Sequence, residues 1–324
     1  MLRRNIAPRP VRVTADNFVR AESHLHFANV VREGGFGKFH NQRALHEAGN
    51  QVVTRPNRDT LYSRAVFDLE AGPVTISLPE PGQRFLSLQV FDEDEYVLDV
   101  SYGAGHHNFS RESAGTRYML AIVRIVVDPR DPADLREAQL LQDAIAVYQE
   151  TRGSFEVPPW DIESQKKVRV ALQALAETVP DTKLMFGSRE RVDPIRHLIG
   201  AAASWGGDPE RDALYLNVVP RLNDGRIIHR LSVKNVPVDG FWSITVYNSQ
   251  GYLEPNGQDI YTINSLTAHK ASDGTVNVLF GGNRQRNPNS LPIMPGWTYM
   301  VRLYRPHRLI LNGKWRFPEA MPVQ

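Results

Sequence analysis

Two blocks of short, alternating segments constrain the fold of this chain most strongly. In both blocks β-branched and aromatic residues alternate with polar ones, and turns such as EAGP and PEPGQ separate the segments. The first block comprises residues 61–69, 73–79, 84–92, 95–102 and 117–127. The second comprises residues 226–235, 240–248, 275–282, 297–306 and 309–317, the last with an Asn-Gly pair typical of a hairpin turn. Strands so closely spaced indicate antiparallel sheets, in a sandwich or barrel.

Helices are predicted before and between the two blocks. Residues 14–35 place Phe18, Leu25, Ala28 and Val31 near helical spacing and end in a pair of glycines. Three further helices are predicted in the middle of the chain, over residues 131–145, 161–179 and about 197–205. Because helices flank the strands instead of alternating with them, a doubly wound parallel sheet and an eight-stranded α/β barrel are disfavoured. The fold class expected is mainly β with helical insertions (α+β).

Length and patterning divide the chain into three parts. At 324 residues it is about twice a typical domain. We expect an N-terminal β-domain with a leading helix (1–130), a helical connecting segment (131–205) and a C-terminal β-sandwich domain (206–324).

Composition excludes several classes of function. Lys and Arg total 38 against 36 Asp and Glu, a net charge of +2, so no nucleic-acid partner is expected. Cys is absent, which excludes disulfides, thiolate metal sites and cysteine nucleophiles. No apolar run approaches the roughly 18 residues of a membrane span, so no membrane insertion is expected. No signal peptide is visible, which makes a cytoplasmic location the default, or a periplasmic one after removal of a leader.

Motif searches point to no cofactor. The chain has neither a G-x-S-x-G nor an H-E-x-x-H motif. His24 and His26 point about 200° apart on a helix and so do not bind one ion, while His106 and His107 are interpreted as a solvated loop. A divalent cation held by carboxylates and His stays a minor alternative.

Three consecutive polar residues, Asn57, Arg58 and Asp59, lead directly into the first strand. Strand alternation places Asn57 and Asp59 on one face and Arg58 on the other. One interpretation is a turn in which Asn57 and Asp59 satisfy backbone groups and Arg58 pairs with a carboxylate. The other is a polar functional cluster at the mouth of a sheet, and the two have even weight.

Asp92 is a second candidate, because it continues the parity of Leu86, Leu88 and Val90 at the end of a strand. Burial at that point would raise the pKa of Asp92, which suits a general acid or base. The alternative is a solvated acidic turn, which the run of four acidic residues favours.

The C-terminal strands combine aromatic and Arg side chains. Alternation assigns His229 to an apolar face, so we interpret it as a core residue. The aromatic residues of this region are interleaved with Arg302 and Arg305: Trp242, Tyr247, Tyr252, Trp297, Tyr299 and Tyr304. One interpretation is that they line an organic-ligand pocket or a sugar-stacking surface. The other, which is favoured, is that they pack the core of a β-sandwich.

These motifs resemble a bacterial and fungal two-domain family, domain of unknown function 1254 followed by domain of unknown function 1214. The N-terminal likeness lies in NRDTLYSRAVFDLEAGPVTISLP and RFLSLQVFDEDEY. The C-terminal likeness lies in VDGFWSITVYNSQGYLEPN, LPIMPGWTYMVRLYRP and LNGKWRFPEA. The resemblance covers most of the chain from about residue 13 and implies two Greek-key β-domains joined by helices. Its members are often exported.

The resulting hypothesis is an enzyme that acts on a small, partly apolar organic molecule in a cleft between the domains. Hydrolysis or elimination fits best, because such chemistry requires only positioned acid–base groups and donors. The residues expected to be catalytic are Asp59, Tyr62 and Asp92. The residues expected to bind the substrate are Asn57, Arg58, Trp205, Tyr215, Tyr247, Arg302 and Tyr304. The alternative is a carbohydrate- or lipid-binding or assembly protein, and a homo-oligomer is expected in either case.

Overall fold

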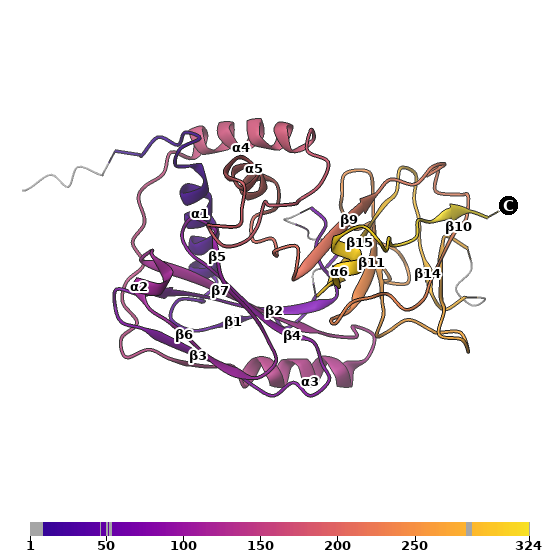
Figure 1. Cartoon of the computed structure of the whole chain (residues 1–324), viewed down its shortest axis with the longest axis horizontal. Helices are drawn as coiled ribbons and strands as arrows, with labels where there is room; N and C mark the ends of the chain where they lie inside the picture. The colour runs from indigo at the N-terminus through magenta and orange to yellow at the C-terminus, as the bar shows by residue number, and fades with distance from the viewer. Residues whose placement is uncertain (1–8, 46, 50, 52–53, 283–286, 324) are drawn as a thin grey trace, which may run out of the picture. The chain divides into compact units, whose positions relative to one another are not determined.

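The structure is a computed structural model that describes residues 9–45, 47–49, 51, 54–282 and 287–323. The chain is mainly β, with several antiparallel sheets and few helices, as the alternating pattern predicts. It divides into two compact units (Figure 1). Unit 1 comprises Met1–Asn41, Tyr62–Arg124 and Leu141–Pro209, and unit 2 comprises Gln42–Leu61, Ile125–Leu140 and Glu210–Gln324. The domain boundaries proposed from the sequence stay predictions.

Unit 1 is built on two sheets. The strands of the first block form a five-stranded sheet in the order β1-β2-β7-β4-β5 and a three-stranded sheet in the order β6-β3-β8. Both β2 and β7 run on by two residues into stretches that belong to unit 2. The strands are β1 (His40–Asn41), β2 (Thr60–Asp68), β3 (Val74–Leu78), β4 (Leu86–Phe91), β5 (Val97–Tyr102), β6 (Gly105–Phe109), β7 (Tyr118–Val126) and β8 (Ala146–Tyr148).

One face of the five-stranded sheet is covered by helix α1 (Phe18–Arg32). Phe27 and Val30 of α1 pack with Val66 of β2, Phe91 of β4 and Leu120 of β7 in one buried cluster. The predicted helix is therefore confirmed, but its buried face is not the predicted one. Leu25 is exposed, because the buried stripe includes Ala21, Glu22, Ser23 and His24 instead, and His24 contacts the acidic turn described below.

The remaining helices of unit 1 are α2 (Arg111–Ala114), α4 (Ile162–Ala176) and α5 (Pro194–Ser204). Helices α4 and α5 lie beside α1 (Figure 1) and bury Leu172 and Ile199 against its Phe18. Local sequence explains the start of α5, because the Asp193 carboxylate accepts hydrogen bonds from two backbone N–H groups of its first turn.

Unit 2 contains two four-stranded sheets, in the orders β12-β11-β15-β9 and β14-β13-β10-β16. Its strands are β9 (Ala213–Val218), β10 (His229–Val233), β11 (Trp242–Tyr247), β12 (Thr262–Asn264), β13 (Val276–Phe280), β14 (Ser290–Leu291), β15 (Thr298–Tyr304) and β16 (Met321–Pro322). Side chains from both sheets, among them Leu231, Ile244, Val278 and Val301, form one buried core. This is the sandwich that the second block of alternating segments predicts. Helix α3 (Pro132–Asp143) lies mostly in unit 2 and confirms the helix predicted over 131–145.

Two local predictions are wrong. The segment 309–317 does not form a hairpin, because Arg308–Leu311 forms helix α6, which buries Ile310 in the sandwich core, and Gly313 turns the chain with a φ of 73°. His106 and His107 do not lie in a loop either. They belong to β6, where they pair with Ser77 and Ile76 of β3.

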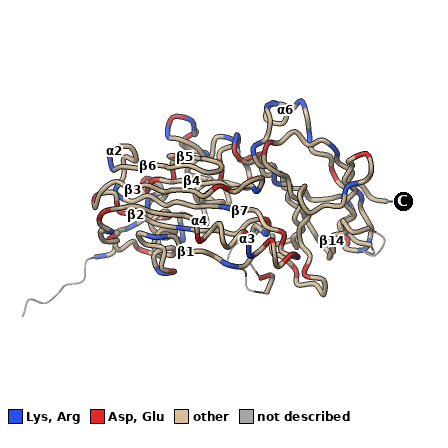
Figure 2. Tube along the Cα trace, turned by 90° about the horizontal axis from the view of Figure 1, so that it is seen from below, with Lys and Arg blue, Asp and Glu red and all other residues tan. Residues whose placement is uncertain are grey.

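Charges of both signs are interspersed along the chain trace (Figure 2), in keeping with a net charge of +2. No helix in the described part of the chain combines the length and the apolar character needed to cross a membrane.

Candidate functional site

The sheet β12-β11-β15-β9 of unit 2 has one apolar and one polar face. Along β11, Trp242, Ile244 and Val246 point into the sandwich core. The other residues of the strand, Ser243, Thr245 and Tyr247, therefore point to the opposite face, because successive strand residues alternate. All three are nevertheless almost fully buried. The sheet thus carries a buried polar layer on its outer side.

Strand register aligns this layer into a row across four strands. Ser243 of β11 lies opposite Asn264 of β12 on one side and opposite Arg302 of β15 on the other. Arg302 in turn lies opposite Tyr215 of β9. Residues paired in this way have Cβ atoms about 5 Å apart, so the four side chains are direct neighbours.

Arg302 is the cation of this layer, and its side chain is only 3% exposed. Its Nη1 donates to Thr245 Oγ1 (3.0 Å), and its Nη2 donates to Tyr247 Oη (2.8 Å) and to the carbonyl oxygen of Arg55 (2.9 Å). Burial alone would lower the pKa of Arg302, but the oxygens of Tyr247, Tyr304 and Asp59 raise it above the usual value. The guanidinium is therefore a fixed, desolvated positive charge.

The segment before β2 supplies the acidic group of the layer. Thr262 Oγ1 and Asn264 Nδ2 donate to Oδ1 of Asp59, at 3.2 Å and 3.3 Å. Asp59 is 0% exposed, and its Oδ2 makes no hydrogen bond of regular geometry in the part of the chain that is described. The same is true of Ser243 Oγ, although the Ser243 hydroxyl group lies beside the Asp59 carboxylate as the third polar side chain around it.

Burial raises the pKa of Asp59 above its usual value. The positive charge of Arg302 opposes this effect most strongly, followed by the polar side chains of Ser243, Asn264 and Thr262. Burial likewise raises the pKa of Tyr247, again against the charge of Arg302. The carboxyl group is thus brought closer to the pH range in which it can both take up and release a proton.

Asn57 and Arg58 hold the segment in place. Asn57 Oδ1 accepts a hydrogen bond from the backbone N–H of Asp59 (2.8 Å), and Asn57 Nδ2 donates to Tyr304 Oη (3.1 Å). Arg58 pairs with Asp259 (3.3 Å) and lies over the ring of Tyr261. The turn interpretation is therefore correct for Asn57 and Arg58, whereas the side chain of Asp59 joins the polar layer.

An apolar cluster adjoins this layer. Tyr247, Leu253, Tyr261 and Met300 form it, and Tyr215 packs against it. Asn57, Thr262 and Tyr215 are half-buried, while the groups between them are buried. The arrangement combines a carboxyl group, a cation, hydroxyl groups and an apolar wall, which together suit a small, partly apolar molecule with a polar head.

The other carboxylate candidate, Asp92, lies in unit 1 at the end of β4. Burial raises the pKa of Asp92 to about 6, although the backbone N–H of Tyr96 opposes this. Asp92 Oδ1 accepts from the N–H groups of Asp94 (2.8 Å) and Tyr96 (2.9 Å), so it holds a tight turn. The alternative of a solvated turn is wrong, since Asp92, Glu93 and Glu95 are all buried.

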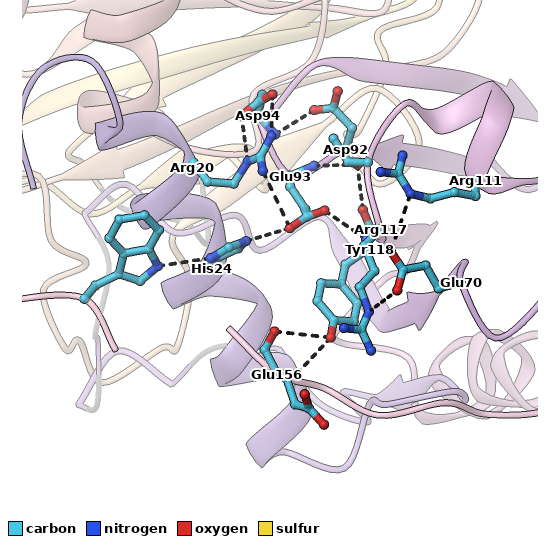
Figure 3. A network of polar contacts seen from close by, with 12 residues as sticks. Arg20, His24, Glu70, Asp92, Glu93, Asp94, Arg111, Arg117, Tyr118 and Glu156 are labelled. Atoms are coloured by element: carbon cyan, nitrogen blue, oxygen red, sulfur yellow. Dashed lines mark hydrogen bonds and ion pairs between the residues drawn. The ribbon is translucent and has the colours of Figure 1, made fainter. Parts of the chain in front are cut away.

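Figure 3 shows how helix α1 contacts this acidic turn. Arg20 forms two hydrogen bonds of 2.7 Å with the Asp94 carboxylate, and His24 Nε2 lies 2.7 Å from Glu93. The backbone N–H of Tyr118 also donates to Glu93. These contacts indicate a structural junction between the helix and the sheet, in which Asp92 is one member.

Tyr62 and Trp205 are also in unit 1. The guanidinium of Arg124 lies 5.6 Å from the ring centre of Tyr62. Trp205 donates from Nε1 to Ser23 Oγ (3.1 Å) and stacks on His26. The structure therefore brings together seven of the predicted site residues in unit 2: Asn57, Arg58, Asp59, Tyr215, Tyr247, Arg302 and Tyr304. It places the other three, Tyr62, Asp92 and Trp205, in unit 1.

Four residues of the polar layer were not predicted from the sequence: Ser243, Thr245, Thr262 and Asn264. A signal was present, because Ser243, Thr245 and Tyr247 recur at every second position of a strand whose other residues are apolar. His229 is confirmed as a core residue, with both ring nitrogens at backbone carbonyl oxygens of Ile227 and Arg221. The described residues contain no group of three or more His, Asp or Glu side chains placed to hold a metal ion.

Two segments of the chain match known family models. The model of a protein of unknown function, DUF1254, matches residues 36–108, and that of another, DUF1214, matches residues 221–308. No curated protein matches the chain.

Two solved structures are similar to the chain over most of its length. The VPA0106 protein from Vibrio parahaemolyticus has a TM-score of 0.74 at 16% identity, with 96% of this chain and 98% of that chain covered. An uncharacterized protein from Burkholderia cenocepacia has a TM-score of 0.53 at 13% identity, with 95% and 87% covered. At such identities the likeness shows the fold alone.

Proposed function

We propose, from the side chains of this chain, that it is an acid–base enzyme. It has the two-domain arrangement of a family of unknown function, DUF1254 followed by DUF1214. The proposed substrate is a small, partly apolar organic molecule with a carbonyl or carboxylate group. The proposed reaction is a hydrolysis or an elimination, with Asp59 as the group that transfers the proton. The site is the polar layer of unit 2, described above.

One observation carries this proposal: the fully buried Asp59 carboxyl group, whose pKa burial raises, shares a sheet face with the buried Arg302. A raised pKa also suits a group that takes up and returns a proton near neutral pH. Burial further strengthens electrostatic interactions with a developing negative charge.

Stabilisation of the negative charge on the substrate oxygen is assigned to Arg302, which Tyr247 helps to hold in place. The hydrogen bonds of Arg302 to Thr245, Tyr247 and Arg55 use three of the five N–H groups that a guanidinium carries. One of the other two is assigned to the substrate oxygen. In a hydrolysis, Asp59 takes a proton from water, the water oxygen bonds to the carbonyl carbon, and the displaced electron pair moves onto the oxygen that Arg302 faces. That pair then re-forms the carbonyl group, the bond from its carbon to the leaving oxygen breaks, and the leaving oxygen takes the proton back from Asp59.

In an elimination, Asp59 takes the proton from the carbon next to the carbonyl group. The electrons of that C–H bond form the new double bond, and the leaving group departs from the neighbouring carbon with its own bonding pair. Arg302 stabilises the enolate-like oxygen in the same way. Both reactions require the same two groups, so one variant tests both.

We expect Asp59→Asn to lower turnover by about 100-fold or more, the range seen when a general acid or base is removed. The amide keeps an oxygen for Thr262 and Asn264 but cannot accept the transferred proton. The assay is consumption of a mixture of small esters, lactones and β-hydroxy acids, followed by mass spectrometry. The matched control is Asp273→Asn, an exposed carboxylate of the same unit, which should consume the same compounds at the wild-type rate.

Two results would contradict the proposal. In the first, the wild-type protein consumes none of the three compound classes. In the second, Asp59→Asn consumes them as fast as the wild-type protein and the Asp273→Asn control do. Circular dichroism of both variants separates loss of turnover from loss of fold.

The alternative function, a binding or assembly protein with an exposed aromatic surface, depends on Trp242 and Trp297 as anchors. Trp242 is 5% exposed and Trp297 is 0% exposed, since both pack in the sandwich core. These two side chains are thus core residues, as the packing interpretation predicts. The homo-oligomer expected from the sequence stays a prediction.

A further inference from the structure

The second sheet of the unit 2 sandwich carries an open hollow on its outer face. Its volume is about 480 Å³, which is within the range of small-molecule sites. Arg230 of β10 and Asn277 and Leu279 of β13 form its floor. Their strand neighbours Leu231, Val276 and Val278 point into the core, so the floor residues face outward. The hollow is therefore separate from the Asp59 layer, which lies on the outer face of the other sheet.

The titratable residues that line the hollow are all basic. It includes Arg230, His269 and Lys270, and none of the lining residues that the structure describes is Asp or Glu. All three basic side chains are exposed. Among the described residues, neither Arg230 nor Lys270 has an ion-pair partner, although other exposed cations of this unit do, such as Lys234 with Asp273. Unpaired cations around one hollow favour an anionic ligand.

The rim of the hollow is held rigidly by Asn289, which is 4% exposed. Asn289 Oδ1 accepts from the backbone N–H of His269 (2.8 Å), and Asn289 Nδ2 donates to the His269 carbonyl (2.7 Å). Asn287 Oδ1 accepts from the N–H of Asn289 (2.9 Å), and Asn287 Nδ2 donates to the carbonyl of Asn277 (3.3 Å). The loop that carries His269 and Lys270 is thus fixed beside Arg230 before any ligand binds, which reduces the entropic cost of binding.

We propose that this hollow binds a small organic molecule with two or more anionic groups, either carboxylates or phosphates. A guanidinium binds such groups through two parallel hydrogen bonds, while Lys270 acts as a separate point charge. Two separated cations therefore match two anionic groups better than one. Asn277 lies within the same lining and suits a hydroxyl group, and Leu279 supplies an apolar contact.

Isothermal titration calorimetry of the full-length protein tests this proposal with two probes, citrate and fructose 1,6-bisphosphate. Fructose is the uncharged control. We expect at least one of the two anions to bind and fructose not to bind, and the affinity should fall as the salt concentration rises. Binding of citrate alone identifies a carboxylate site, and binding of the bisphosphate alone identifies a phosphate site.

Variants locate the binding. Arg230→Gln and Lys270→Gln should each weaken binding by about tenfold or more, because each removes a charge-assisted contact. Arg316→Gln and Lys314→Gln remove the same charges from exposed positions of the same unit outside the hollow, and should bind as the wild-type protein does. All four positions are on the surface, so the fold is expected to tolerate the changes.

The proposal is overturned if neither anion binds, if Arg230→Gln and Lys270→Gln bind like the wild-type protein, or if the two control variants lose affinity to the same extent. The last result would indicate a diffuse electrostatic effect. None of these outcomes depends on turnover or on Asp59, so the proposed acid–base function is tested independently.

Discussion

Arg302→Gln is expected to lower the free energy of unfolding of unit 2 by about 3 kcal/mol or more, the usual cost of removing one charge from a buried polar network. The shorter amide cannot make the three hydrogen bonds that Arg302 donates to Thr245, Tyr247 and the Arg55 carbonyl. It also removes the positive charge that most strongly opposes the raised pKa of Asp59. The first effect leaves buried oxygens without hydrogen-bond donors, and the second leaves the Asp59 carboxylate without its nearby positive charge.

Hydrogen–deuterium exchange of peptides from β11 and β15, with and without denaturant, measures this change within unit 2. The control is Arg230→Gln, an exposed arginine on the other sheet of the same sandwich, which should change the stability by no more than about 0.5 kcal/mol. A loss below about 1 kcal/mol for Arg302→Gln would show that the polar layer does not hold the sheet and the Asp59 segment together.

The second large effect is expected at Glu95 in unit 1, where Glu95→Gln should stabilise the protein at neutral pH. Glu95 is 0% exposed and lies in the turn after β4 with a φ of 61°, a backbone conformation that is strained for a residue with a side chain. Its Oε1 accepts from the N–H of Gly206 (2.7 Å), but its Oε2 has no hydrogen-bond partner in the described structure. Burial raises the pKa of Glu95 well above its usual value, and the charges of Glu22 and Asp92 add to this.

The direction of the pH dependence follows from this raised pKa. The folded state keeps the proton on Glu95, whereas the unfolded chain releases it once the pH exceeds the ordinary pKa of a glutamate. The unfolded state then binds fewer protons, so the stability of the wild-type protein falls as pH rises from that value towards the folded-state pKa. Glutamine does not titrate, so this loss is absent in Glu95→Gln.

We expect the Glu95→Gln variant to equal the wild-type protein near pH 4 and to be more stable by on the order of 2 kcal/mol near pH 7, because each pH unit above the ordinary pKa of a glutamate costs a folded state that keeps the proton about 1.4 kcal/mol. Urea unfolding followed by fluorescence across pH 4–8 measures the difference. Glu177→Gln, at the exposed end of α4, is the control and should show the wild-type pH dependence. A difference that is the same at both pH values would contradict a protonated Glu95 in the folded state.

Regular secondary structure was largely determined by local sequence. Each predicted segment of the first block contains a strand, because an extended backbone places alternate side chains on opposite faces and the sequence repeats at that period. Helix α3, predicted over residues 131–145, likewise begins at Pro132, because the fixed φ of proline suits the first position of a helix. Such signals act within a few residues and need no partner from elsewhere in the chain.

Local signals failed where a distant partner decided the outcome. Asn312-Gly313 is as compatible with the end of a helix as with a hairpin, and burial of Ile310 in the sandwich core accompanies the helix. Leu25 looked like a core residue, but the face of α1 that carries Glu22 and His24 is buried instead, because Arg169 and Glu93 supply partners for those two side chains.

The candidate site shows the same division. The sequence by itself determined that Asn57, Arg58 and Asp59 lead into a strand and that Tyr247 and Arg302 lie on strands of the second block. Only the tertiary structure decided that Arg302 lies beside Ser243 and that Asp59, more than 180 residues earlier in the chain, reaches the same sheet face. The physical reason is that side-chain parity is a property of one strand, whereas register, burial and hence the pKa of Asp59 depend on which distant strands pack together.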